Sequence, residues 1–326
     1  MQENKKQNLI GGAFVLVLST VFVKVLGLMY KIPLTTFIGE VGRGYFNAAY
    51  NIYTPIFAIS MAGLPVALST LVSHNVALGF YRNARKIFRV AFMLFFVMGV
   101  VGTFFLLLIA YPYSVYLINS KQTLMSIVCI APSVFFCCVM ATYRGYYEGL
   151  CDMKPTAISQ IIEAIGKTVL GLAFAYIVMK VGSSQIPQGV VFGVKISSEA
   201  EGYSVIYPYS AAGAVLGVTA GTVVGLIYLI ILKRTRKDGF TKAQLMSSPY
   251  PQPTSEISRK LIRTAIPVVA SSLIVNITNL IDAVTVQNRL ANAVARNTDI
   301  IKQMYNTALT ASNTLDRDIS TYLYGV

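Results

Sequence analysis

Two lysines lie inside the first long apolar run of the chain. Lys24 comes fifteen residues after Leu9, and Lys31 follows seven residues later. Seven residues make about two helical turns, so a helix would put both ammonium groups on one stripe, roughly 10 Å apart. A lysine at that depth in a membrane costs about 2.5–3.5 kcal/mol. The pattern favours a water-filled cavity that receives an anion, and the alternative is that Lys24 snorkels to the headgroups.

Further ionisable and polar residues fall in later apolar runs. Glu163 and Lys167 are spaced i,i+4 with the acid first, which is the favourable order for a helical ion pair. Asn276, Asn279 and Asp282 follow one another at three-residue steps and make a polar stripe. We expect the pair to be either structural or part of ion coupling. A carboxylate in the stripe could bind a coupling ion, H+ or Na+.

Glycines and prolines mark helices that pack closely or bend. Gly213, Gly217, Gly221 and Gly225 recur every four residues and share one helical face. Such a face lets a neighbouring backbone approach, either as static packing or as a sliding surface. Prolines interrupt other apolar runs, at Pro55, Pro65, Pro132 and Pro267. They predict broken helices that line cavities or act as bending points.

Motifs for catalysis and metal binding are missing from the sequence. Gly166-Lys167-Thr168 ends like a phosphate-binding loop, but Ile161 stands where the first glycine would be. The cysteines lack zinc-ligand spacing and are expected to be apolar packing residues. They are Cys129, Cys137, Cys138 and Cys151. We therefore expect neither an enzyme nor a bound cofactor.

The composition is that of an integral membrane protein. Hydrophobic residues make up 55% of the chain and charged residues 12%, and the mean hydropathy is +0.62. Soluble domains do not reach these values. The sequence predicts an all-α, polytopic helix bundle with seven membrane spans. They cover residues 9–30, 45–72, 90–113, 123–143, 156–179, 207–232 and 264–288.

The net charge of +14 follows the predicted topology. Sixteen Lys and Arg residues fall at the N-terminus or in loops on its side of the membrane, against five in the opposite loops before the tail. The positive-inside rule therefore predicts a cell-membrane protein with a cytoplasmic N-terminus, an inside loop at 233–263 and an outside loop at 181–206. The basic excess also predicts attraction to anionic membrane lipids, and not a nucleic-acid partner.

The predicted spans divide the chain into three parts. Residues 1–232 would form a six-helix N-terminal lobe, and residues 233–263 a basic cytoplasmic linker with a flexible run from Ser247 to Pro253. Residues 264–326 would begin a second lobe with one helix and an outside loop. The odd number of helices, and an end where apolar character returns, predict that this second lobe is truncated. The expected partner is its missing C-terminal remainder.

Three segments carry a resemblance to a known family. They are GAFVLVLSTVFVKVLGLMYKIP (12–33), AISMAGLPVALSTLVS (58–73) and RGYYEGLCDMKPTAISQIIE (144–163). Together they resemble the multidrug/oligosaccharidyl-lipid/polysaccharide flippase superfamily. Within it they are similar to the stage V sporulation protein B branch of polysaccharide-biosynthesis membrane proteins, relatives of the MurJ-type lipid II flippases. The resemblance runs through nearly the whole chain.

That resemblance implies a fourteen-helix carrier whose two six-helix lobes enclose a V-shaped cavity that opens alternately to each side. The implied substrate is an undecaprenyl-diphosphate-linked saccharide, a lipid II-like peptidoglycan or polysaccharide precursor, with its diphosphate held by cavity cations. Lys24 and Lys31 match the basic first-helix positions of the family, and Arg43 and Arg144 are further candidates. One departure is that residues 45–72 contain no Lys or Arg, where MurJ-type flippases place arginine.

Three other functions fit parts of the pattern. A cation-coupled multidrug exporter of the same superfamily would favour acidic cavity residues, whereas the candidates here are mainly lysines. A seven-helix receptor would place its N-terminus outside, against the charge bias. A non-transporting scaffold for cell-wall assembly would not need a lysine as deep as Lys24.

Overall fold

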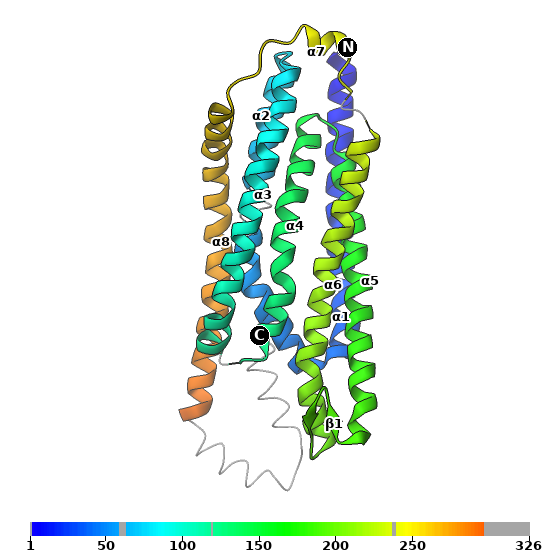
Figure 1. The fold of residues 1–326 in the computed structure, drawn as a ribbon, viewed down its shortest axis with the longest axis vertical. Helices are drawn as coiled ribbons and strands as arrows, with labels where there is room; N and C mark the ends of the chain where they lie inside the picture. The colour runs from blue at the N-terminus through cyan, green and yellow to red at the C-terminus, as the bar shows by residue number, and fades with distance from the viewer. Residues whose placement is uncertain (1, 59–62, 119, 237–238, 297–326) are drawn as a thin grey trace.

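A computed structural model describes residues 2–58, 63–118, 120–236 and 239–296 as an elongated bundle of long helices (Figure 1). The helices are α1 (Gln2–Ala58), α2 (Leu64–Ala77), α3 (Tyr81–Pro112), α4 (Thr123–Gly149), α5 (Lys154–Gln185), α6 (Glu199–Thr235), α7 (Lys242–Met246) and α8 (Thr254–Arg296). Within the described residues, five of them are long and apolar enough to cross a membrane, namely α1, α3, α4, α5 and α6. The chain is therefore an all-α, polytopic membrane protein, as the sequence predicted.

The first two expected spans have the wrong boundaries. Residues 31–44, expected as a loop, are helical, and the chain turns at Gly39, where φ is 68° and ψ is 173°. Glycine adopts this backbone conformation without the steric penalty of a side chain. Figure 1 shows α1 running from the N-terminus along the bundle and then turning across its far end. The hydrophobic runs on the two sides of Gly39 thus form two helical segments that meet at a kink.

The expected span 45–72 is divided between two helices. The second half of α1 ends at Ala58, and α2 begins at Leu64 with Pro65 in its first turn. A proline is tolerated there because the first N–H groups of a helix have no partner within the helix. Residues 59–62 lie outside the described residues, so the predicted break between Pro55 and Pro65 stays a prediction.

Helices α3 to α6 cover the next four expected spans and extend beyond them. The outside loop expected at 181–206 is much shorter, because α5 reaches Gln185 and α6 begins at Glu199. Between them lie a 3₁₀ turn (Ile186–Gln188) and an antiparallel hairpin of β1 (Val190–Val191) and β2 (Val194–Lys195). Ser198 caps α6, its hydroxyl accepting a hydrogen bond from the N–H of Glu201.

The inside loop expected at 233–263 is partly helical. It contains α7 and the first ten residues of α8. Its expected flexible run is held against α3 by three hydrogen bonds, one of which Asn83 Nδ2 donates to Gln252 Oε1 at 3.3 Å. The Arg82 N–H donates to Ser248 Oγ at 3.1 Å, and the Gln252 N–H donates to Asn83 Oδ1 at 3.0 Å. The run is anchored in spite of its three prolines.

The beginning of α8 also packs into the core. Ile257, Leu261 and Ala265 are buried in one cluster with Leu68 of α2 and Phe95 of α3. The seventh expected span, 264–288, thus belongs to a longer helix. The part of α8 that precedes residue 264 packs against α2 and α3.

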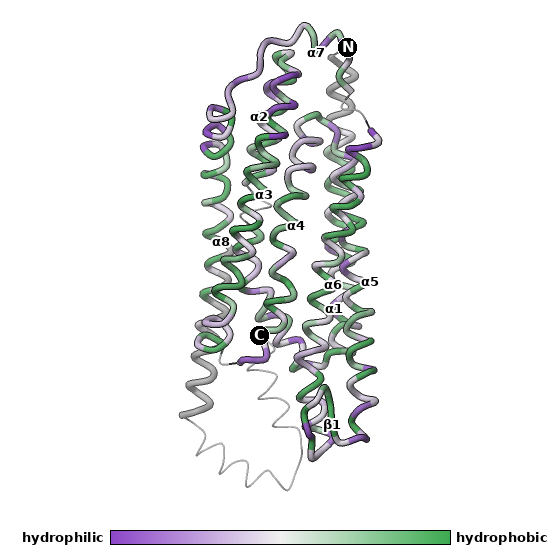
Figure 2. Tube along the Cα trace, in the orientation of Figure 1, coloured by the Kyte–Doolittle hydropathy of each residue, from purple (hydrophilic) through white to green (hydrophobic). Residues whose placement is uncertain are grey.

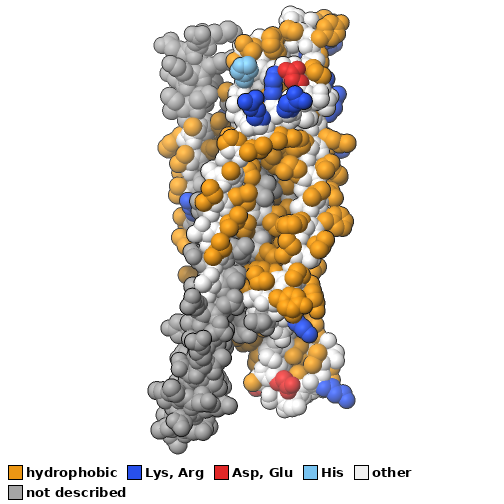
Figure 3. Space-filling model, turned by 90° about the vertical axis from the view of Figure 1, so that its left-hand side faces the viewer, with side chains coloured by type: hydrophobic (Ala, Val, Ile, Leu, Met, Phe, Trp, Pro, Cys, Tyr) orange, Lys and Arg blue, Asp and Glu red, His pale blue; other side chains and the backbone are white. Residues whose placement is uncertain are grey.

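Polar residues gather at the two ends of the bundle and apolar residues between them (Figure 2). The space-filling view shows a band of hydrophobic side chains with most charged side chains above and below it (Figure 3). The N-terminus and α7 lie at one end, and β1 lies at the other (Figure 1). The described parts of 233–263 and of 181–206 therefore meet at no point and lie toward opposite ends of the bundle, while the cytoplasmic orientation of the N-terminus stays a prediction.

Candidate functional site

The first half of α1 contacts α5 along one side. Ser19 is buried, and its hydroxyl lies 3.2 Å from Oε1 of Gln160. Two turns before the Gly39 turn, the Tyr30 hydroxyl lies so close to Gly171 that a Cβ there would be 2.7 Å away. Leu34 is buried in the next turn of the same side. These contacts fix which side of α1 faces the bundle.

Another side of α1 carries the two lysines and is not covered by the described structure. Lys24 and Lys31 are both exposed, and neither forms an ion pair with a described residue. A Cβ added at Gly27, between them, would meet no atom within 4 Å. Apolar side chains beside the stripe are also exposed, with Phe22 at 46% and Leu28 at 65%. The cationic stripe expected from the sequence is thus an open surface.

The other two expected substrate-binding cations do not join this stripe. Arg43 lies on the second half of α1, beyond the turn at Gly39, and is half-buried. Arg144 lies on α4 and is only 3% exposed. The four basic residues singled out from the sequence therefore occupy three separate environments.

Arg144, Glu163 and Lys167 form a buried ion-pair network between α4 and α5. Nη2 of Arg144 lies 2.8 Å from Oε2 of Glu163, and Nζ of Lys167 lies 2.6 Å from Oε1. Nε of Arg144 also donates to Ser159 Oγ at 2.9 Å. The i,i+4 contact expected from the sequence is present, and Arg144 is an additional partner from another helix. Arg144 is thus buried and bonded within the protein, and its expected role in substrate binding stays a prediction.

The glycine face of α6 packs directly against this part of α5. A Cβ added at Gly221 would overlap the backbone of Lys167, and one at Gly217 would overlap Gly171. A Cβ at Gly225 would lie 3.1 Å from Cβ of Glu163. The four-residue spacing in α6 thus lets the α5 backbone approach at the level of the network. The structure shows close packing, and sliding of this surface stays a prediction.

A stripe of aromatic residues follows the second half of α1 and contacts α4. Tyr50 lies at its centre. Its ring stacks on Phe46 at a centroid distance of 4.8 Å and meets Tyr53 edge-on at 5.8 Å. The Tyr53 hydroxyl lies 3.6 Å from Sγ of Cys137. Sequence analysis missed this stripe, although its three- and four-residue spacing is the signal that identifies it.

The cysteines and Pro132 were also singled out from the sequence. The expected interruption at Pro132 is absent, because α4 continues through it from Thr123 to Gly149. Cys137 and Cys138 are buried packing residues, whereas Cys151 is exposed, in a turn after α4 with φ of 60°. Near Pro132, hydroxyl groups of neighbouring helices satisfy α4 carbonyl oxygens. Thr219 donates to Cys129 at 2.7 Å and Thr103 to Ala131 at 3.3 Å.

Comparison with known proteins now places this arrangement in a family. A family model described as polysaccharide biosynthesis protein matches residues 9–194. The chain belongs to the polysaccharide biosynthesis protein family. The matched region contains the stripe on α1 and the whole network of α4 and α5. The side chains of Asn276, Asn279 and Asp282 lie outside both this region and the described residues.

Curated relatives of the chain are found in Bacillus subtilis. The chain is 28% identical to lipid II flippase MurJ over 298 residues, which cover 87% of the chain and 50% of the relative. It is 24% identical to stage V sporulation protein B over 288 residues, which cover 88% of the chain and 51% of that relative. The chain thus spans about half the length of the curated relatives it matches.

Solved structures show the same fold at low sequence identity. A MOP superfamily transporter from Pyrococcus furiosus aligns with a TM-score of 0.60 and 15% identity, over 92% of the chain and 60% of the transporter. An inward-facing multidrug resistance transporter of the MATE family aligns with a TM-score of 0.54 and 16% identity, over 79% of the chain and 53% of the transporter. The bundle therefore has the fold of these MOP superfamily transporters.

Proposed function

We propose that the full-length protein is a flippase that moves an undecaprenyl-diphosphate-linked saccharide across the cell membrane by alternating access. The observation that carries the proposal is the open stripe of Lys24 and Lys31 on α1. Membership of the polysaccharide biosynthesis family supports it, as does the similarity to a relative named as a lipid II flippase. In the proposed carrier the stripe faces a cavity between this lobe and a second one.

The two lysines suit the transient binding of a diphosphate. Each ammonium group is a compact charge with three donors, and it does not clamp phosphate in the bidentate geometry of arginine. In a cavity of lowered dielectric, each charge-assisted hydrogen bond contributes about 1.5–3 kcal/mol. Two such contacts hold the substrate firmly enough to gather it from the membrane while still allowing release. Arg43 is a further cation for the substrate. It is half-buried and lies on the second half of α1, beyond the turn at Gly39.

The network of Arg144, Glu163 and Lys167 has a different role in the proposal. Both carboxylate oxygens of Glu163 are already occupied by basic groups. The network therefore joins α4 to α5, and the glycine face of α6 holds α5 in turn, so that the three helices move as one body. We assign coupling to H+ or Na+ to the stripe of Asn276, Asn279 and Asp282. The ion pairs of Glu163 then do not need to break during transport.

Reconstitution separates this function from its rivals. The full-length protein is placed in liposomes with a fluorescent undecaprenyl-diphosphate disaccharide, and the fraction accessible from outside is followed with an ion gradient of H+ or Na+. We expect flipping of this lipid and no export of a cationic dye. Dye export without lipid flipping would favour the multidrug exporter. The absence of both activities from folded protein would favour the scaffold.

A further inference from the structure

A cavity of about 390 Å³ lies at the β1 end of the bundle, where the end of α5 and the beginning of α6 meet α1. Its lining residues from α1 are Thr36, Phe37 and Gly39. Five residues turn a helix by about 140°, so Thr36 lies on another side of α1 than Lys31. The cavity is therefore separate from the cationic stripe.

Aromatic rings form the walls of this cavity. Phe37 of α1 meets Tyr176 of α5 edge-on, with ring centres 5.6 Å apart. Tyr203 and Tyr207 of α6 lie with ring centres 6.1 Å apart and ring planes at 26°. The ring of Tyr207 fits beside the turn at Gly39, since a Cβ there would lie 2.9 Å from it. Three helices thus contribute aromatic rings to one cavity.

Hydrogen-bonding groups stand among these rings. Lys180 is exposed and forms no ion pair with a described residue. The hydroxyl groups of Ser183 and Thr36 donate to carbonyl oxygens of their own helices, at 3.1 and 3.3 Å. Their lone pairs can still accept a hydrogen bond, whereas the Lys180 ammonium group can only donate. The cavity therefore offers both donors and acceptors, and none of the described residues that line it is acidic.

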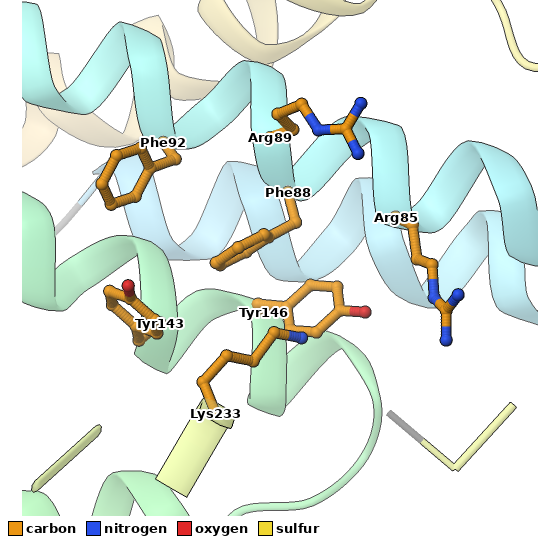
Figure 4. Close-up of a pocket in the computed structure, with 7 residues that line it drawn as sticks. All are labelled: Arg85, Phe88, Arg89, Phe92, Tyr143, Tyr146 and Lys233. Atoms are coloured by element: carbon orange, nitrogen blue, oxygen red, sulfur yellow. The ribbon is translucent and has the colours of Figure 1, made fainter. Parts of the chain in front are cut away.

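A cavity at the α7 end of the bundle makes an instructive contrast (Figure 4). It is also lined by aromatic residues, but Nζ of Lys233 lies 4.1 Å from the ring centre of Tyr146 and 4.9 Å from that of Phe88. A group of the protein already covers these rings. Nζ of Lys180 is 5.9 Å from the ring centre of Tyr176, and Tyr176 is 48% exposed. The ring of Tyr176 is therefore accessible to a ligand.

Rings combined with donors and acceptors favour one class of ligand. A pyranose has a face of C–H groups, which packs on an aromatic ring, and hydroxyl groups that both donate and accept hydrogen bonds. A phosphate only accepts hydrogen bonds and would not use the acceptors of the cavity. A hydrocarbon chain would leave the polar groups without hydrogen bonds. The volume is also sufficient, since small-ligand pockets begin at about 300 Å³.

We propose that the cavity of α1, α5 and α6 binds a saccharide, with a sugar ring against Tyr176 and Tyr203. Lys180 and Ser183 hydrogen-bond the sugar hydroxyl groups. The saccharide belongs either to a lipid-linked sugar in the adjacent leaflet or to a soluble glycan. The site does not depend on the proposed transport activity, because it is separate from the lysine stripe. Tyrosines also gather at membrane surfaces without any ligand, so the test must separate binding from interfacial placement.

Tryptophan fluorescence can report binding, because the chain contains no tryptophan. Tyr176→Trp and Tyr203→Trp each keep an aromatic ring in the cavity of the full-length protein, in a background where any tryptophan outside residues 1–326 is replaced by phenylalanine. Tyr116→Trp is the control, since Tyr116 is 73% exposed, follows α3 and does not line the cavity. Each variant is titrated with N,N′-diacetylchitobiose in nanodiscs. We expect a saturable emission shift at positions 176 and 203 and none at position 116.

Side-chain variants in the Tyr176→Trp background then test the contacts. Tyr203→Leu should weaken binding about tenfold, because leucine has no ring face, and Tyr203→Phe should keep most of the affinity. Lys180→Gln should weaken binding about fivefold. Lys195→Gln removes the same charge from an exposed position of β2 and should change nothing. Circular dichroism and gel filtration of each variant ensure that only folded protein is compared.

Undecaprenyl diphosphate with and without an attached N,N′-diacetylchitobiose identifies the source of the sugar. Tighter binding of the lipid-linked than of the soluble disaccharide would assign the cavity to lipid-linked sugars, and equal binding would assign it to soluble glycans. Three outcomes would overturn the proposal. No shift at positions 176 and 203 would mean that no saccharide binds there. An equal shift at position 116 would mean unspecific contact with the sugar. An equal shift with the sugar-free lipid would mean a site for lipid alone.

Discussion

The basic residues of α1 and those of α4 and α5 differ in what surrounds them. Lys24 and Lys31 are exposed, and they have no ionic partner among the described residues. Arg144 and Lys167 share the carboxylate of Glu163, and the side chain of Arg144 is only 4% exposed. Both groups lie within apolar segments that can cross a membrane. The same residue type is therefore used in two ways within one lobe.

The difference teaches which cations belong to the fold and which are available for function. A buried cation beside a carboxylate is compensated within the protein, so the removal of either partner leaves an unpaired buried charge. A lysine on an open helix face has no such compensation. The free energy that its charge costs on membrane insertion is not offset by contacts within the protein. Substitutions should therefore damage folding in the first group and spare folding in the second.

The largest effect on stability is expected from Glu163→Gln. This change leaves the buried Arg144 and the half-buried Lys167 close together without their shared anion. The loss is about 3–5 kcal/mol, which corresponds to a fall in apparent Tm of roughly 10 °C. A thiol-reactive dye can follow unfolding, because Cys137 and Cys138 are buried. The measurement uses a Cys151→Ser background, which removes the exposed thiol. Lys24→Met is the control and should not lower Tm. Equal Tm values for the two variants would remove the distinction between the groups.

A smaller loss is expected where α6 packs on α5. Gly217→Ala adds a Cβ that overlaps the backbone of Gly171, so the two helices must separate. Overpacking of this kind costs about 1–3 kcal/mol. Gly27→Ala is the matched control, since a Cβ there meets no atom within 4 Å. Alanine should stabilise that open helix by up to about 1 kcal/mol. If both substitutions shift Tm in the same direction, the close approach of α5 and α6 is wrong.

The smallest effect is expected at the end of the bundle. Arg236 pairs with Asp152 at 2.6 Å, but its side chain is 57% exposed. Exposed ion pairs contribute about 0–1 kcal/mol, and salt screens them. Arg236→Gln should therefore move Tm by no more than a degree or two, and 0.5 M NaCl should remove even that shift. A change as large as that of Glu163→Gln would show that contact distance matters more than burial.

The sequence predicted the class of fold because hydropathy marks long apolar runs directly. It also predicted the contact of Glu163 with Lys167 and the close face of glycines, since both depend on spacing within one helix. It did not predict Arg144 as the third partner, because nineteen residues and a turn separate Arg144 from Glu163. Helix ends were wrong at residues 31–44 and 181–206 because hydropathy ends at the membrane surface while helical hydrogen bonds continue.

The turn at Gly39 shows why such errors arise. Nothing in the hydropathy of residues 31–44 distinguishes a loop from a helix interrupted at one glycine. A side chain at Gly39 would also meet the ring of Tyr207, which lies 2.9 Å from the position that a Cβ would occupy. A contact between residues so far apart in the chain is not visible in any local pattern.

Charge substitutions at Lys24 in the full-length protein test the central claim most directly. Complementation of a flippase-depleted strain is measured for Lys24→Arg, Lys24→Ala and Lys24→Glu, at equal amounts of membrane protein. Partial growth is expected for arginine, severe loss for alanine and none for glutamate, because a carboxylate repels the diphosphate. Lys195→Glu, at an exposed position of β2, makes the same charge change and should support normal growth. Normal growth of Lys24→Glu would mean that the stripe is a snorkelling anchor and would contradict the binding of an anionic substrate on α1.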